Sequence, residues 1–378
     1  MPEREMPLPT VLEPRGRTLG AEERAAVLRV LDSAVLCSSF GGEARALESE
    51  MSLLYATPDA IPEAIACSSG TAALHLAVAA AGIGPGDEVI TTPVSDFGTV
   101  APVLAQGGSV VFADVRPEDG TLDPQAVEAA VTDRTKAVIV VHLFGAAADV
   151  DALRAICDRH SLVLIEDSAQ AWLGEDASGR LLGTAGDIAC FSLQQYKHIT
   201  AGDGGLALTR DPALARRMRL FMDKGWDRSE GRIHRVMGLN YRMPELSAAV
   251  ARAQLGKVAD VVRLRRERAG QLAEALRDVP AVRMPRQRQG HAWWVMPLLV
   301  DDNARWARAL GELGVPALPG YLERTLYANP ALPGHPPGLC PRAEELIART
   351  LLVLPWNEGY SPDDVDRIAR ALREVAAG

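Results

Sequence analysis

The sequence contains little cysteine, and its cysteines are not spaced to form a framework. Five cysteines are scattered along the 378 residues, and no two of them form a CxxC pair. Such pairs build zinc ribbons and redox centres, and their absence argues against both. We therefore predict no disulfide scaffold and no metal site, and we expect a protein of the reducing cytoplasm.

Long apolar runs and an excess of basic residues are also missing. No run approaches the ~20 apolar residues that a membrane-spanning helix requires. Residues 1–17 mix charges with prolines where a signal peptide would carry an apolar stretch. The net charge is −9, which argues against nucleic acid as a partner, because binding its phosphates needs a basic face. We expect neither a membrane nor a nucleic-acid partner, whereas a local pocket can still hold a small anionic substrate.

The sequence does contain a regular alternation of strand-like and helix-like segments. Short apolar runs occur near residues 65–67, 88–92, 109–113, 137–141 and 162–165, with helical patterns between them. Strands that are apolar throughout and are joined by helices indicate a parallel sheet covered on both faces. We therefore predict an α/β fold with a mostly parallel sheet.

The last third of the chain has a different pattern. A long helical pattern runs over residues 244–276, a strand is expected near residues 293–300, and a final helix over residues 362–375. A chain of this length is long enough for two domains. We predict a large domain over residues 1–270 and a small α+β domain over residues 271–378.

One lysine is distinguished by its surroundings. Lys197 lies in a small polar loop that glycines close at residues 202–205, downstream of Asp167 at the end of an apolar strand. A partly buried lysine has a lowered pKa and is the usual former of a Schiff base. A carboxylate can sit against the pyridine nitrogen of pyridoxal phosphate and keep it protonated. The pair predicts an enzyme that uses this cofactor, although Asp167 alone could equally be a helix cap.

A strand-to-helix turn offers further cofactor contacts. The sequence Ser-Ser-Gly-Thr-Ala at residues 68–72 provides free N–H groups and a positive helix end for a phosphate, and its glycine permits close approach. The alternative is an ordinary helix cap. Gln170 follows Asp167 by three positions and could reach the ring hydroxyl of the cofactor. Ser192 could add a hydroxyl to the phosphate site.

Together these segments resemble the DegT/DnrJ/EryC1/StrS aminotransferases, the sugar aminotransferase group of fold-type I pyridoxal phosphate enzymes. The resemblance runs from about Gly41 to Arg373. It is carried by ordered motifs at residues 68–74, 84–89, 142–145, 166–170, 186–187 with 191–192, Lys197, 202–205 and 240–243. The resemblance implies a fold-type I transferase, with a large α/β domain and a smaller α+β C-terminal domain, that works as a homodimer.

The resemblance also implies roles for individual residues. Lys197 would carry pyridoxal 5'-phosphate and Asp167 would contact its pyridinium, so that these two are the catalytic residues. The other cofactor-binding residues would be Gly70, Thr71 and Ser192 at the phosphate, Gln170 near the ring oxygen, Phe97 over the ring, and Asn240 at the phosphate of the partner subunit. The active sites would therefore be shared across the homodimer interface.

The implied reaction is transfer of an amino group from glutamate or glutamine to a nucleotide-linked hexulose or a keto-cyclitol, as in aminosugar and antibiotic biosynthesis. Arg228 and Arg232 could hold a diphosphate or the donor carboxylate, or they could belong to a solvated loop. Candidate substrate-side residues with hydrogen bonds or aromatic faces are Asp96, Trp226, Arg228, Tyr321 and Trp356.

Parts of the sequence also allow two other functions. One is a different pyridoxal phosphate reaction, such as dehydration of a deoxysugar, in which the family replaces the lysine with histidine; Lys197 argues against it, although His198 is adjacent. The other is a non-catalytic regulator of biosynthesis. It would need a partner-binding or DNA-binding surface, and the acidic charge argues against the latter.

Overall fold

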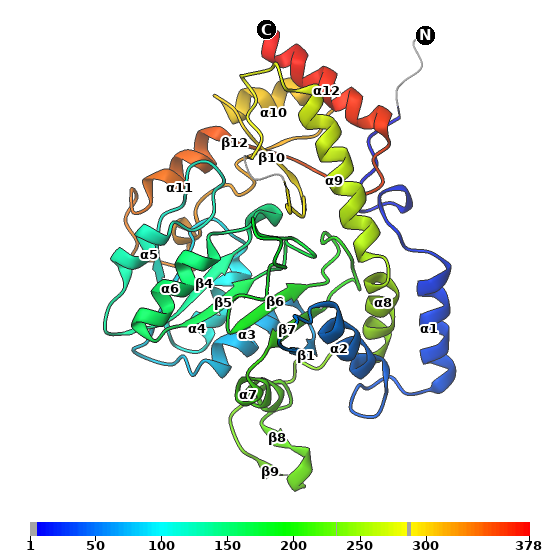
Figure 1. The fold of residues 1–378 in the computed structure, drawn as a ribbon, viewed down its shortest axis with the longest axis vertical. Helices are drawn as coiled ribbons and strands as arrows, with labels where there is room; N and C mark the ends of the chain where they lie inside the picture. Colours follow the sequence, from blue (N-terminus) through cyan, green and yellow to red (C-terminus); the bar gives the residue numbers. More distant parts are fainter. Residues whose placement is uncertain (1–5, 232, 286–288) are drawn as a thin grey trace.

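The described residues of the computed structural model, 6–231, 233–285 and 289–378, contain a central seven-stranded sheet (Figure 1). Its strands, in sheet order, are β1 (Glu63–Cys67), β7 (Gly205–Thr209), β6 (Ile188–Ser192), β5 (Val163–Asp167), β4 (Thr135–Val141), β2 (Glu88–Thr91) and β3 (Ser109–Phe112). The strands from β6 to β3 are parallel, and β7 runs antiparallel to both of its neighbours. The prediction of a mostly parallel α/β sheet is confirmed.

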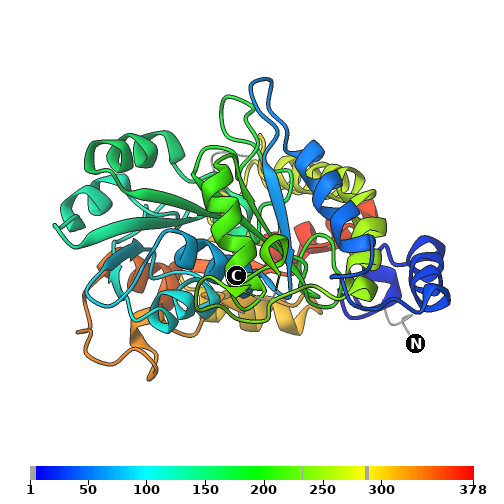
Figure 2. The ribbon, with the colours of Figure 1, turned by 90° about the horizontal axis from the view of Figure 1, so that it is seen from below.

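Helices cover both faces of this sheet, because most of its strands are apolar on both sides (Figure 2). One face carries α3 (Gly70–Ala80), α4 (Ala101–Ala105) and α7 (Pro212–Met222). The other face carries α2 (Glu43–Leu54), α5 (Pro124–Ala130), α6 (Val150–His160) and α8 (Glu245–Leu255). Strand β1 shows the alternation: Ile65 packs into the α3 cluster, whereas Ala64 and Ala66 pack into the α2 cluster.

A smaller part with its own apolar core follows in the chain. It contains the antiparallel strands β10 (Met296–Leu299), β12 (Leu351–Leu354) and β11 (Leu318–Pro319), with α9 (Val258–Ala275), α10 (Asn303–Glu312), α11 (Pro341–Glu345) and α12 (Pro362–Ala377). The prediction of a single helix over residues 244–276 was wrong. A turn at Gly256 and Lys257 separates α8 from α9, and glycine has a low helix propensity. The boundary at residue 270 stays a prediction and falls within α9.

The N-terminal residues connect the two parts. In Figure 1 the blue chain passes the red C-terminal region and the yellow-green α9 before it reaches α1 (Ala21–Ser33). The side-chain amide of Asn357 donates to the Pro9 carbonyl at 2.8 Å, and that of Gln195 donates to the Val11 carbonyl at 2.8 Å. Residues 8–17, which we call the N-terminal strap, are therefore bound both to the loop that carries Lys197, which we call the lysine loop, and to the smaller C-terminal part, which we call the small part.

A short hairpin of β8 (Trp226–Asp227) and β9 (Ile233–His234) projects from the large part, at the bottom of Figure 1. Among the described residues, none of the helices combines the length and apolar character that crossing a bilayer requires.

Candidate active site

The carboxyl ends of the parallel strands open into a cavity of about 640 Å³, which we call the Lys197 cavity. Ligands in open α/β sheets gather at this edge. The strap and the small part complete its walls through residues such as Leu12 and Pro355. Six of the predicted site residues line it together: Gly70, Thr71, Asp167, Gln170, Ser192 and Lys197.

Lys197 is partly buried, and its amine faces an aromatic ring. Its Nζ lies 3.9 Å from the centroid of the Trp294 ring, and Trp294 Nε1 donates to the Tyr196 carbonyl at 2.6 Å, which fixes the indole. Burial lowers the pKa of Lys197 to about 8, although the charges of Asp167 and Asp96 partly offset this effect. More of the amine is therefore in its neutral, nucleophilic form near neutral pH.

Asp167 ends β5 with its carboxylate held from two sides. Oδ2 accepts a 2.9 Å hydrogen bond from Thr99 Oγ1, and Oδ1 accepts one of 3.2 Å from the Ala169 N–H. Burial raises the pKa of Asp167, whereas these hydrogen bonds and the charge of Lys197 lower it. A buried carboxylate at a cavity wall gains stability from a cation, as a protonated pyridine nitrogen would supply.

The start of α3 forms a cradle suited to a phosphate. The N-cap Ser69 accepts the Ala72 N–H at 3.0 Å, while the first amides of the helix, at Gly70 and Thr71, have no intrahelical acceptor. A Cβ added to Gly70 would lie 2.7 Å from the Cβ of Ser192. Glycine is therefore needed for β6 to approach the helix end, where amide donors and the positive dipole favour an anion.

Gln170 is oriented by the backbone. Its Oε1 accepts the Phe144 N–H at 2.7 Å, so its amide NH₂ is the group available to the cavity. A donor at this position suits a ring oxygen of the cofactor.

The structure does not bring Phe97 and Asn240 into this cavity. Phe97 packs against the apolar core, while the next residue, Gly98, lines the cavity; its stacking role stays a prediction. Asn240 is exposed and pairs through its backbone with Asp223, at the base of the hairpin. The aromatic residues that do line the cavity are Tyr196, Trp294, Tyr321, Trp356 and Tyr360.

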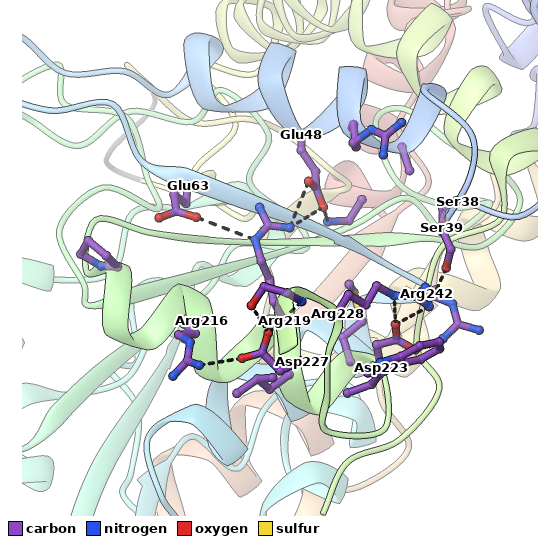
Figure 3. Close-up of a pocket in the computed structure, with 18 residues that line it drawn as sticks. Ser38, Ser39, Glu48, Glu63, Arg216, Arg219, Asp223, Asp227, Arg228 and Arg242 are labelled. Carbon is purple, nitrogen blue, oxygen red and sulfur yellow. Dashed lines mark hydrogen bonds and ion pairs between the residues drawn. The ribbon is translucent and has the colours of Figure 1, made fainter. Parts of the chain in front are cut away.

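A second cavity, of about 470 Å³, lies at the base of the hairpin (Figure 3). Its charged side chains largely pair with each other: Asp223 with Arg228 (2.8 Å) and Arg242, Arg216 with Asp227 (2.7 Å), and Arg219 with Glu48 (3.1 Å). The Arg228 guanidinium also stacks 4.0 Å from the Trp226 ring centroid. These contacts join side chains at the base of the hairpin to each other, and Lys197 and Asp167 do not line this second cavity.

The candidate substrate-side residues divide between the two cavities. Asp96, Tyr321 and Trp356 line the Lys197 cavity, whereas Trp226 and Arg228 line the second one. Arg232 lies outside the described residues.

Sequence reasoning missed three contributors to the Lys197 cavity. Thr99, Trp294 and the strap carry no local motif; Thr99 and Trp294 contact the site only through tertiary packing. The one available signal for Thr99 was its place two residues after Phe97, which the resemblance puts over the cofactor ring.

Comparison with known proteins identifies the family of this chain. The profile of the DegT/DnrJ/EryC1/StrS aminotransferase family matches residues 17–373. The L-glutamine:2-deoxy-scyllo-inosose aminotransferase of Streptomyces kanamyceticus is 37% identical, over 94% of this chain and 87% of that protein. The UDP-N-acetyl-3-dehydro-alpha-D-glucosamine 3-aminotransferase of Acidithiobacillus ferrooxidans is 35% identical, over 93% of this chain and 92% of that protein.

A solved structure is similar over nearly the whole chain. The crystal structure of DesV from S. venezuelae in complex with a ketimine intermediate superposes with a TM-score of 0.87 and 33% identity, covering 94% of this chain and 95% of that one. The chain belongs to the DegT/DnrJ/EryC1/StrS aminotransferase family and is a pyridoxal phosphate-dependent aminotransferase with the fold-type I architecture.

Proposed function

We propose that this enzyme transfers an amino group from glutamate or glutamine to the ketone of a hydroxylated ring, either a nucleotide-linked hexulose or a keto-cyclitol, in aminosugar or natural-product biosynthesis. The observation that carries the proposal is the composition of the Lys197 cavity. Beyond the cofactor groups it is lined by Asp96, Tyr321 and Trp356. A carboxylate and aromatic faces suit a polyol ring, and both curated relatives named above are aminotransferases of cyclic ketones.

The six predicted site residues that line the cavity each have a task in this reaction. When bound, pyridoxal phosphate supplies the electron sink for the donor α-carbon. Lys197 holds the cofactor and then moves the proton of that carbon, and such general acid–base transfer typically contributes ~10²–10⁴-fold in rate. Asp167 keeps the ring nitrogen protonated. Gly70, Thr71 and Ser192 bind the phosphate, and Gln170 orients the ring.

The two alternative functions gain less support. A dehydratase of this family would carry histidine at the position of Lys197. His198 does not substitute for it, because it is buried and its Nε2 contacts the Ala292 carbonyl at 2.8 Å. Burial also holds the pKa of His198 well below its usual range. A regulator without catalysis would not need the lysine, carboxylate and anion cradle that line one cavity.

The proposed assembly is a homodimer with shared active sites, in which Asn240 reaches the phosphate of the partner subunit. Asn240 is exposed beside the hairpin. Large apolar side chains are exposed in the same region: Leu36, Phe40, Val236, Met237 and Leu239. The Leu36 carbonyl accepts the Glu245 N–H at 3.1 Å, which holds this loop close to the segment that carries Asn240. Exposed apolar patches mark interaction surfaces, and a second copy would cover this one.

The proposed location is the cytoplasm. All five cysteines lie within the described residues and are free thiols, which suits a reducing compartment.

A substrate panel tests the proposed function. The enzyme would be incubated with glutamate or glutamine and, in turn, with nucleotide-linked ketohexoses, inososes and simple 2-keto acids. Soft-ionisation mass spectrometry would measure the masses of the products. We expect amination of one of the two ring-ketone classes. Preferred use of a simple 2-keto acid as the acceptor would overturn the sugar or cyclitol assignment.

A further inference from the structure

Two buried arginines, one before Lys197 in the sequence and one after it, donate hydrogen bonds to the backbone at and beside this lysine. Arg17, at the end of the strap, donates from Nη1 to the carbonyl oxygen of Lys197 itself, at 2.7 Å. Arg265 of α9 donates from Nη1 to the carbonyl of Trp294 at 2.8 Å. Trp294 is the residue whose ring lies against the Lys197 amine, so both the lysine and its aromatic neighbour are anchored.

One carboxylate joins these arginines. Glu358 Oε2 accepts from Arg265 Nε at 3.0 Å and Nη2 at 2.7 Å, and its Oε1 lies 4.0 Å from Arg17 Nη1. All three side chains are at most 2% exposed. Burial lowers the pKa of Arg17 to about 10; the charge of Glu358 offsets part of this effect, and the charge of Arg265 adds to it.

Fold stability alone does not account for this arrangement. Two positive charges share one carboxylate away from water, and Arg17 Nη2 and Glu358 Oε1 have no hydrogen-bond partner among the described residues. Desolvating charges in this way costs free energy that a single ion pair often fails to recover. An apolar contact would close the strap at a lower cost, but it could not fix a backbone carbonyl.

The strap also forms part of the cavity wall beside the lysine. Residues 8–12 line the Lys197 cavity. They are held by Gln195 from the lysine loop and by Asn357 from the small part, each at 2.8 Å from a strap carbonyl. Releasing Arg17 would therefore loosen both the lysine backbone and the segment that screens its amine from water.

We propose that Arg17 is a positioning residue for Lys197: through the Lys197 carbonyl and the closed strap it fixes the amine against Trp294 and keeps it dehydrated. The inference rests on the proposed role of Lys197 as the cofactor-binding lysine. Loss of Arg17 exposes the amine to water, raises its pKa toward the ordinary value of 10.5 and slows its reaction with the cofactor. It should leave the phosphate cradle unchanged, because the hydrogen bonds of Arg17 go to the backbone carbonyls of Val11, Lys197 and His198 and not to the start of α3.

The test measures the Lys197 amine directly. Competitive acetylation of the full-length, cofactor-free protein across pH, with peptide mass spectrometry, gives the pKa of Lys197 in wild type, Arg17→Met, Arg17→Lys and Arg15→Met. Arg15 lies on the same strap but pairs with Glu13 at the surface, which makes it the matched control. We expect a midpoint near 8 for wild type and Arg15→Met, a rise of about one pH unit or more in Arg17→Met, and partial rescue in Arg17→Lys.

Further measurements separate positioning from folding. Arg17→Met should bind pyridoxamine phosphate, which cannot react with lysine, as tightly as wild type does. If Arg17→Met does not fold, Gln195→Met replaces it, because this variant loosens the strap without touching the buried charges, and it should raise the Lys197 pKa by a smaller amount. An unchanged midpoint in a folded Arg17→Met protein, or in Gln195→Met where that variant replaces it, would overturn the proposal. Borohydride fixation of pyridoxal phosphate on a lysine other than Lys197 in wild type would instead overturn the proposed function.

Discussion

Thr99 Oγ1 and Asp167 Oδ2 lie 2.9 Å apart, and both side chains are buried at the end of β5. Thr99 also shares a 2.8 Å hydrogen bond with Ser95, so its hydroxyl can donate to the carboxylate while it accepts from the serine. The Ala169 N–H holds the other carboxylate oxygen. The Asp167 carboxylate is thus oriented by 3₁₀ helix η2 (Phe97–Thr99) as well as by its own strand.

This contact predicts the effect of removing the threonine hydroxyl. Thr99→Val should lower kcat about tenfold to a hundredfold, because a hydrogen bond to a charged group contributes about 1.5–3 kcal/mol. Thr99→Ser keeps the hydroxyl and should stay close to wild type. Steady-state kinetics of the three proteins provide the check, and a Thr99→Val enzyme as active as Thr99→Ser would show that the hydroxyl does not orient Asp167 for catalysis.

Asp167→Asn should keep the fold and lose most activity. The neutral amide matches the carboxylate in shape but cannot stabilise a protonated pyridine nitrogen. Asp211→Asn is the control, because Asp211 caps α7 by accepting the Ala213 N–H and lies outside the Lys197 cavity. Thermal unfolding would establish that both variants are folded, and Asp167→Asn activity above about a tenth of wild type would count against the electron-sink role.

The parts of the site that the sequence predicts are those whose chemistry is local. The immediate sequence neighbours are enough to single out Asp167 at a strand end, Lys197 in a glycine-closed loop and Gly70 at a helix start. Thr99 and Arg17 do not, because they contact Asp167 and Lys197 across 68 and 180 positions. Such contacts depend on how the strap, η2 and the strand ends pack together.

The fold shows the same division. Strands buried on both faces are apolar throughout, so the alternation of strands and helices over residues 65–165 could be predicted from the pattern alone. The break between α8 and α9 was missed because the helical pattern continues on both sides of Gly256. The stacking assignment of Phe97 came from the family resemblance and stays a prediction; in this chain Asp96 precedes and Gly98 follows Phe97, which packs against the apolar core.

Borohydride should fix the cofactor onto Lys197. The purified protein is expected to be yellow, and Lys197→Ala should bind pyridoxal phosphate without covalent attachment. With a Lys197 pKa of about 8, attachment to cofactor-free protein should accelerate as pH rises through 8, because only the deprotonated amine attacks the aldehyde. Absorbance and peptide mapping check both points. A midpoint near 10.5 would show that the amine is not desolvated.

Gly70→Ala should weaken cofactor binding about tenfold or more. The new Cβ would lie 2.7 Å from the Ser192 Cβ, and overpacking of this kind typically costs about 1–3 kcal/mol. The matched control is Gly84→Ala, since a Cβ at Gly84 meets nothing within 4 Å. Fluorescence titration with pyridoxamine phosphate measures the affinity; equal affinities of the two variants would contradict the cradle.

Mixing two inactive chains tests the shared active sites. If Asn240 serves the partner subunit, a heterodimer of Lys197→Ala and Asn240→Ala chains contains one intact site, made of Lys197 from one chain and Asn240 from the other. Random pairing of equal amounts in a twofold dimer should therefore restore about a quarter of wild-type activity. Lys197→Ala mixed with Asp167→Asn is the control and should restore nothing, because both residues line the cavity of their own chain. Equal recovery in the two mixtures would contradict the arrangement, and a monomer by sedimentation would exclude it.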